Sequence, residues 1–268
     1  MPFERIRDLD LYYELHGSGE PVVLISGTGG DLRTNPARGR GPLERGFQVL
    51  MYDQRGLGQT SKPDEPCTMA DYAADCAALL DVVGWERAHV VGVSFGGMVA
   101  QHLALDHPER VDRLVLACTS SGGAGGASFD LLTVHHLPPE ERLAVVAPVL
   151  DSRNDLTVEP PVLAPGFDAV LAGLRAGPRN ADDPAAPVGA RRQLEARAGH
   201  DTWNRLPAVT APTLVVGGRY DQQAPVANVE RLAGRIPGAE LRFYDGGHLF
   251  LLQDPSAWAD IVAFLARR

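Results

Sequence analysis

The fold is decided by the stretch Val90-Val91-Gly92-Val93-Ser94-Phe95-Gly96-Gly97-Met98. It places Gly-x-Ser-x-Gly between a β-branched apolar run, typical of a buried strand, and a helical pattern. The chain must reverse sharply there, with Ser94 in a strained backbone conformation that projects its hydroxyl outward. Side chains two residues before and after Ser94 would collide, which explains Gly92 and Gly96, while Gly97 lets the helix approach the sheet. The pattern predicts a nucleophilic serine at a helix N-terminus, whose positive end and free N–H groups favour developing negative charge.

Other apolar runs of the same kind occur along the chain. The stronger ones are residues 22–25, 89–93, 114–117 and 214–216, and the weaker ones are residues 47–52 and 239–244. Because these runs do not alternate with polar residues, they indicate strands that are covered on both faces, as in parallel sheets. Helical spacing follows in residues 71–83, 98–106 and 256–265, the last with Ser256 as the expected cap. This alternation predicts an α/β fold, a mostly parallel twisted sheet flanked by helices.

Two segments depart from this alternation. Residues 3–15 alternate in polarity and turn at residues 8–10, which predicts an antiparallel hairpin at the sheet edge. Residues 120–206 hold no strand-like run but three helical patterns separated by prolines, at residues 140–150, 168–176 and 188–198. We therefore expect residues 1–119 and 207–268 to form one core domain and residues 120–206 to form a helical cap inserted into it.

Composition excludes several classes of protein. The 268 residues carry a formal net charge of -9, so a nucleic acid or an anionic membrane surface would repel the chain. Three cysteines without C-x-x-C spacing argue against a disulfide framework and a zinc site, and no histidine pair has i, i+4 ligand spacing. No run approaches the roughly 18 apolar residues of a membrane span, and acidic residues stand where a signal peptide would be apolar. A reduced, cytoplasmic protein is expected, without a metal or cofactor.

A serine nucleophile needs a base, and that base needs an orienting acid. The order expected for this architecture is serine, then an acid, then histidine. Asp221 follows the strand-like run 214–216, and His248 follows the weaker run 239–244 in a loop with Gly246 and Gly247. Both therefore lie at the sheet edge that holds Ser94, where open α/β sheets bind ligands.

On these motifs the sequence resembles the α/β hydrolase fold superfamily, over nearly the whole chain outside residues 120–206. The resemblance implies that Ser94 is the nucleophile, Asp221 the acid and His248 the base.

The resemblance also implies an oxyanion hole of two backbone donors. One is the N–H of Phe95, and the other, by alignment, is the N–H of Thr28 in the loop after residues 22–25. Family members usually carry His-Gly at the start of this loop, where this chain has Ser26-Gly27. Because the donor is a main-chain group, the departure need not harm catalysis.

A second motif, in residues 53–61, is similar to the family's D-x-R-G-x-G-x-S stretch. We expect Asp53 and Arg55 to be structural, paired with each other or with neighbouring loops.

The resemblance implies a serine hydrolase that acts on a small carboxylic ester or a lactone. Residues 25–33, with their missing histidine, are similar to the enol-lactone hydrolase branch. Two alternatives use the same residues, a carbon–carbon bond hydrolase of diketones and a cofactor-free haloperoxidase. A non-catalytic binding protein would predict a damaged triad, whereas all three positions are filled here. The expected partner is a small-molecule substrate, and the oligomeric state stays open.

Two further groups of residues are candidates for shaping a pocket. Three histidines lie in the expected cap: His135, His136 and His200. Four arginines are candidates for anchoring a substrate carboxylate: Arg33, Arg175, Arg191 and Arg192.

Overall fold

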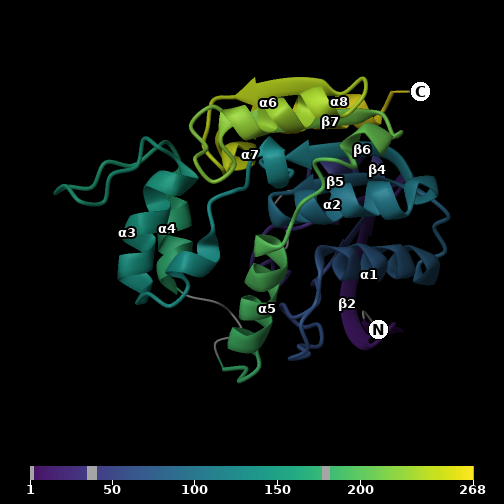
Figure 1. The fold of residues 1–268 in the computed structure, drawn as a ribbon, viewed down its shortest axis with the longest axis horizontal. Coiled ribbons are helices and arrows are strands. Elements are labelled where there is room, and N and C mark those ends of the chain that lie inside the picture. Colours follow the sequence, from purple (N-terminus) through teal and green to yellow (C-terminus); the bar gives the residue numbers. More distant parts are fainter. Residues whose placement is uncertain (1–2, 35–40, 177–181, 268) are drawn as a thin grey trace.

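A twisted eight-stranded sheet crosses the computed structural model, which describes residues 3–34, 41–176 and 182–267 (Figure 1). The strands are β1 (Phe3–Ile6), β2 (Leu9–Gly17), β3 (Glu20–Ile25), β4 (Phe47–Tyr52), β5 (Ala88–Val93), β6 (Val111–Ala117), β7 (Thr213–Gly218) and β8 (Glu240–Tyr244). Their order is β1-β2-β4-β3-β5-β6-β7-β8, and β3 to β8 run parallel to one another, whereas β2 pairs antiparallel with β4. β1 and β2 form an antiparallel hairpin at one edge. The predicted mostly parallel sheet and the edge hairpin are confirmed.

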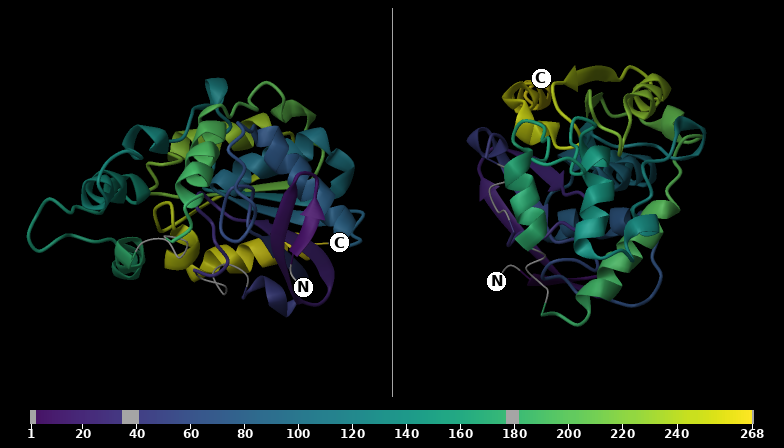
Figure 2. Two further views of the ribbon diagram at one scale, coloured as in Figure 1. Left: turned by 90° about the horizontal axis from the view of Figure 1, so that it is seen from below. Right: turned by 90° about the vertical axis from the view of Figure 1, so that its left-hand side faces the viewer.

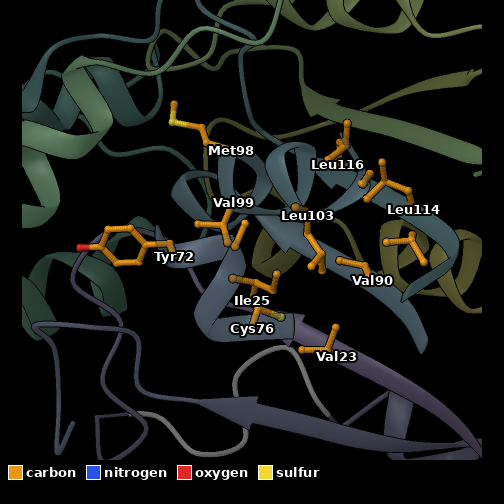
Figure 3. Packing of buried hydrophobic residues seen from close by; sticks show 14 of the residues in the cluster. Val23, Ile25, Tyr72, Cys76, Val90, Met98, Val99, Leu103, Leu114 and Leu116 are labelled. Carbon is orange, nitrogen blue, oxygen red and sulfur yellow. The ribbon is translucent and has the colours of Figure 1, made fainter. Parts of the chain in front are cut away.

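Helices cover both faces of the sheet. On one face lie α1 (Met69–Val82), α2 (Phe95–Asp106) and α6 (Val226–Arg235), and on the other lie α7 (Phe250–Gln253) and α8 (Pro255–Leu265). Val90 packs into the core under α1 and α2, whereas its neighbour Val91 packs into the core under α8. Successive strand residues point to opposite faces, so burial of both faces explains the unalternated apolar runs. Figure 3 shows the first of these cores, where Val99 and Leu103 of α2 face the strands.

The ends of two helices differ from expectation. The expectation that Ser256 caps the last helix is wrong, because α8 begins at Pro255 and its cap is Asp254. The Asp254 carboxylate accepts a hydrogen bond from the Ser256 N–H at 3.0 Å. Proline suits the first helical position, since its fixed φ is helical and it has no N–H to satisfy. Helix α2 begins at Phe95, three residues before the predicted start, so Ser94 directly precedes it.

Three longer helices lie between β6 and β7, where residues 120–206 are the expected cap. They are α3 (Pro139–Leu150), α4 (Phe167–Ala176) and α5 (Ala186–Ala198). Figures 1 and 2 show α3 and α4 standing off from the sheet as a pair, while α5 lies closer to it. The pair has its own small apolar cluster, which includes Leu143, Phe167 and Leu171. Residues 1–2, 35–40 and 268 of the expected core and residues 177–181 of the expected cap lie outside the described ranges. The division into core and cap stays a prediction.

The inserted helices contact the loops that follow the strands. The His248 N–H donates to the carbonyl of Leu150 at the end of α3, at 2.5 Å, and the Gln222 N–H donates to Val149 at 3.0 Å. Helix α5 approaches the loop after β4 so closely that a Cβ on Gly189 would overlap the carbonyl oxygen of Gly56. Among the helices of the described ranges, none has the length and apolar character to cross a membrane.

Candidate active site

The turn between β5 and α2 holds Ser94 in a strained conformation. Its φ of 55° and ψ of -114° lie in a region that non-glycine residues rarely occupy. A Cβ on Gly92 would overlap the carbonyl oxygen of Gly96, and a Cβ on Gly96 would overlap that of Ile25 in β3. Glycine is therefore required at both positions, because the backbone atoms that a Cβ would overlap cannot move aside. The structure gives Ser94 the sharp turn that the sequence predicts.

A chain of hydrogen bonds joins Ser94, His248 and Asp221 from three separate loops. His248 Nε2 lies 2.8 Å from Ser94 Oγ, and His248 Nδ1 lies 2.8 Å from Asp221 Oδ2. The other Asp221 oxygen accepts the N–H groups of Gln223 at 2.8 Å and Ala224 at 2.9 Å. Asp221 is fully buried, and its two side-chain oxygens are both satisfied. This arrangement keeps the carboxylate fixed and turns the imidazole so that Nε2 faces the serine hydroxyl.

A fourth side chain, that of Gln223, reaches the same atoms. Its amide nitrogen lies 3.0 Å from His248 Nε2 and 3.5 Å from Ser94 Oγ, and the residue is buried. No sequence pattern predicts this residue, because an uncharged amide two positions after an aspartate matches no catalytic spacing.

The neighbouring thiol of Cys118 is buried and is a poor nucleophile. Burial raises the pKa of Cys118 well above its ordinary value, so the thiol stays protonated.

The loop after β3 lies directly against Ser94. A Cβ placed on Gly27 would lie 3.4 Å from the Cβ of Ser94. The Gly30 N–H bonds the Gly27 carbonyl at 3.2 Å, which closes a turn with Thr28 and Gly29 at its centre. Phe95 is the first residue of α2, so its N–H has no partner within the helix. The loop and the start of α2 thus both lie next to Ser94.

Two buried glutamines hold this loop in place. Gln193 of α5 accepts the Gly29 N–H through its side-chain oxygen at 2.9 Å, and Gln54 donates to the Ser26 carbonyl at 2.8 Å. The sequence did not predict either glutamine, because each one bonds a backbone group that lies far away along the chain. The loop is therefore fixed from the core side and from the inserted helices.

An apolar cavity of about 140 Å³ opens beside His248. Its lining comprises Leu24, Ser26, Gly27, Met51, Val93, His248, Leu249, Leu251, Leu252 and Trp258. An apolar cavity of about 150 Å³ holds one benzene molecule, so this cavity accommodates a small apolar group next to His248.

A second cavity of about 150 Å³ lies by the end of α5, and Met98, Arg197 and His200 are among its lining residues. Of the three candidate histidines, His200 thus lines a cavity. Ser94, Asp221 and His248 are not among the lining residues of this cavity.

Arg55 and Asp53, which the sequence singled out, each bond other groups of the protein. Arg55 bonds Asp8 at 2.7 Å and Asp75 at 2.8 Å. Of the two expected arrangements, it therefore pairs with neighbouring segments and not with Asp53. Burial opposes the charge of Arg55, but these two carboxylates outweigh it and raise its pKa. Asp53 instead accepts the N–H groups of Leu32 and Gln59, each at 2.8 Å. Arg55 thus links the loop after β4 to the β1–β2 turn and to α1, and Asp53 links it to the loop after β3.

The four candidate anchors for a substrate carboxylate also have carboxylate partners within the protein. Arg33 bonds Asp31 at 2.7 Å, and Arg175 lies 3.5 Å from Glu140. The remaining ion pairs are Arg191 with Asp64 and Glu195, and Arg192 with the same two residues. Nothing in these pairings favours a role in substrate binding. In the part of the chain that the structure describes, no group of three His, Cys, Asp or Glu side chains could hold a metal ion.

Comparison with known proteins agrees with this architecture. A family model described as the α/β hydrolase fold matches residues 20–255. A protein of Variovorax paradoxus (strain S110), provisionally named carbamate hydrolase RutD, is 32% identical over 270 residues, covering 97% of each chain. The poly(3-hydroxyalkanoate) depolymerase of Ectopseudomonas oleovorans is 31% identical over 222 residues, covering 82% of this chain and 75% of its own. The enol-lactonase of Burkholderia xenovorans LB400 has a TM-score of 0.80 at 24% identity, covering 99% of this chain and 100% of that one, which shows a shared fold.

Proposed function

Since the chain belongs to the α/β hydrolase fold family, we propose that it is a serine hydrolase that cleaves a small carboxylic ester or lactone through an acyl-enzyme. The observation that carries this proposal is the hydrogen-bonded chain from Ser94 through His248 to Asp221. A buried carboxylate, an oriented imidazole and a strained serine at a helix N-terminus are the parts that acyl transfer requires.

In the proposed acylation, Ser94 Oγ attacks the substrate carbonyl carbon while His248 Nε2 takes the hydroxyl proton. Asp221 stabilises the imidazolium that forms, because its Oδ2 accepts from Nδ1. The backbone N–H groups of Phe95 and Thr28 bind the oxyanion of the tetrahedral intermediate. His248 then gives its proton to the leaving oxygen, and Ser94 remains esterified until water hydrolyses it.

The lining of the cavity beside His248 supports a small apolar acyl or alcohol group. At about 140 Å³, it holds a group of roughly benzene size. The similarity to a poly(3-hydroxyalkanoate) depolymerase also supports an ester, because that polymer is a polyester. We expect turnover to be highest for short acyl chains and to fall once the chain outgrows the cavity.

A carbamate is the second candidate substrate, favoured by the similarity to the Variovorax relative over nearly the whole chain. The same residues would attack a carbamate carbonyl, and His248 would then protonate a leaving nitrogen or oxygen. The two candidates differ in the group that departs rather than in the nucleophile.

The test is a panel of nitrophenyl esters of increasing chain length, simple lactones and alkyl carbamates. For whichever class is turned over, Ser94→Ala should lower kcat by at least about 10⁴-fold. Ser152→Ala, which removes an exposed serine hydroxyl, is the matched control and should retain wild-type rates. Full turnover by Ser94→Ala would refute the proposal, and selective turnover of carbamates would favour the second candidate.

A further inference from the structure

The guanidinium of Arg197, near the end of α5, is buried without a carboxylate partner among the described residues. Only 5% of the residue is exposed. Its Nη1 donates to the Phe129 carbonyl at 2.8 Å, whereas Nε and Nη2 are buried and bond no group of the described residues. The segments outside the described ranges contain no aspartate or glutamate. Because a buried charge without a partner is costly, Arg197 needs an anion that these residues do not supply.

The two unpartnered nitrogens form the edge of the guanidinium that this chain uses elsewhere to bind carboxylates. Arg33 Nε and Nη2 bond the two oxygens of Asp31 at 3.0 Å and 2.7 Å. Arg153 bonds Asp151 through the same two nitrogens, at 2.9 Å and 2.8 Å. The planar fork of Nε and Nη2 matches the spacing of two carboxylate oxygens. The edge of Arg197 that bonds nothing in the protein is therefore suited to a carboxylate.

The direction in which each arginine's pKa moves agrees with these contacts. The hydrogen bonds to Asp31 raise the pKa of Arg33, and those to Asp151 raise the pKa of Arg153. Burial instead lowers the pKa of Arg197, because no carboxylate bonds it. A carboxylate placed against Arg197 would offset this effect of burial.

Arg197 lines the cavity of about 150 Å³ at the end of α5. Met98 and His200 line it as well and are buried, so they form its inner side together with Arg197. Three further lining residues are exposed, which shows where the cavity opens to solvent: Ala127, Asp130 and Ala198. A small molecule can therefore enter from the surface and reach the side chain of Arg197.

Two other titratable groups line this cavity. His200 donates from Nε2 to the Ser120 carbonyl at 3.0 Å, and burial lowers its pKa to about 3, so the ring is neutral at physiological pH. Asp130 accepts the Leu132 N–H at 2.9 Å and is exposed, so solvent and salt screen its charge. Among the lining residues, Arg197 thus provides a buried positive charge, and Asp130 a negative charge on the exposed side.

We propose that this cavity binds a small carboxylate, whose two oxygens accept hydrogen bonds from Nε and Nη2 of Arg197. A cavity of about 150 Å³ holds a molecule of roughly benzene size, so the ligand is an acid of few carbon atoms. The acid released from a small ester belongs to this chemical class. Because Ser94, Asp221 and His248 do not line the cavity, the proposal does not rest on the hydrolase function.

The test measures the binding of acetate by isothermal titration calorimetry at constant ionic strength, with acetamide as the uncharged comparison. An anion of this size held by two charge-assisted hydrogen bonds should bind with a Kd of about 1 mM. Acetamide should bind at least about tenfold more weakly, and Arg197→Met should raise the Kd for acetate at least about tenfold. Ser94→Ala should bind acetate as the wild type does.

Arg191→Met is the matched control, because it removes an arginine of the same helix that is already paired with Asp64 and Glu195. It should leave the Kd for acetate unchanged. Arg197→Lys keeps the charge without the edge of two nitrogens and should weaken binding at least about threefold. Asp130→Asn removes the negative charge on the exposed side of the cavity and should tighten binding about twofold.

Thermal unfolding without acetate shows whether Arg197→Met is folded. Its Tm should equal or exceed that of the wild type, because an apolar chain replaces a buried charge that has no partner. If this variant does not fold, the Kd values of Arg197→Lys and Asp130→Asn still test the site.

Equal affinity for acetate and acetamide, or an unchanged Kd in Arg197→Met or Arg197→Lys, would overturn the proposal. Absence of acetate binding to the wild type would also overturn it, since water would then satisfy Arg197. Equal weakening in Arg191→Met would show a general effect of positive charge and no site. These outcomes are independent of the hydrolase proposal, because acetate binding and the effect of Ser94→Ala on turnover are measured separately.

Discussion

The side-chain oxygen of Gln193 accepts a hydrogen bond from the backbone N–H of Gly29 at 2.9 Å, although the two residues lie 164 positions apart. Gln193 is buried in α5, one of the inserted helices, and Gly29 follows Thr28 in the loop that lies against Ser94. The inserted helices therefore take part in fixing the loop that would supply the second oxyanion donor.

We predict that Gln193→Leu lowers kcat about tenfold and changes KM little. Complete removal of an oxyanion donor costs about 10²–10³ in kcat, and a loosened loop should lose a part of that. Steady-state kinetics on the best ester of the panel checks this, with thermal unfolding to verify the fold. Glu195→Gln, on the same helix, should behave as the wild type, and an unchanged kcat in Gln193→Leu would show that the loop needs no support from α5.

Gly96→Ala should destabilise the protein and abolish activity. The added Cβ would overlap the carbonyl oxygens of Ile25 and Ser26, so β3 and α2 must separate. We expect a loss of about 1–3 kcal/mol in the free energy of unfolding, measured by denaturant titration. Gly234→Ala in α6 is the matched control, because its Cβ meets open space, and it should be neutral or stabilising by up to about 1 kcal/mol. A Gly96→Ala variant of wild-type stability would mean that the turn is looser than the structure indicates.

Acid should destabilise the wild type partly through His200. Burial, with smaller contributions from the nearby His102 and Arg197, lowers the pKa of His200 to about 3. An unfolded histidine takes up its proton near about pH 6.5, so between pH 6.5 and 3 the unfolded state binds a proton that the native state does not. Stability that is present above pH 6.5 is therefore lost as the pH falls through this window.

The corresponding variant is His200→Gln, which keeps a donor for the Ser120 carbonyl that His200 now bonds at 3.0 Å. Between pH 7.5 and pH 5, its free energy of unfolding should fall by about 2 kcal/mol less than that of the wild type. Denaturant titrations at the two pH values measure the difference. Parallel losses in both proteins would show that His200 titrates normally in the folded state.

The sheet and the meeting of Ser94, Asp221 and His248 could be predicted from the sequence, because local chemistry constrains them strongly. Gly92 and Gly96 are required because a Cβ at either position would overlap backbone atoms. Strands that are buried on both faces need continuous apolar runs. Asp221 and His248 stand out because they follow buried strands, at the sheet edge where open α/β sheets bind ligands.

The glutamines and the packing of the inserted helices could not be predicted in the same way. Gln54, Gln193 and Gln223 act through neutral amides on distant backbone or ring atoms, and such pairings follow no spacing rule. Helical periodicity located α3, α4 and α5 but carried no information on their directions. The pattern around Ser256 suggested a cap, whereas the adjacent Pro255 and Asp254 set the start of α8.

The central claim is that Ser94 is a nucleophile activated by His248, and covalent labelling tests it most directly. The protein is treated with a fluorophosphonate, and the modified peptide is located by mass spectrometry. We predict a single adduct on Ser94, absent in Ser94→Ala and formed far more slowly in His248→Asn. An adduct at another residue, or none on the folded wild-type protein, would contradict the account.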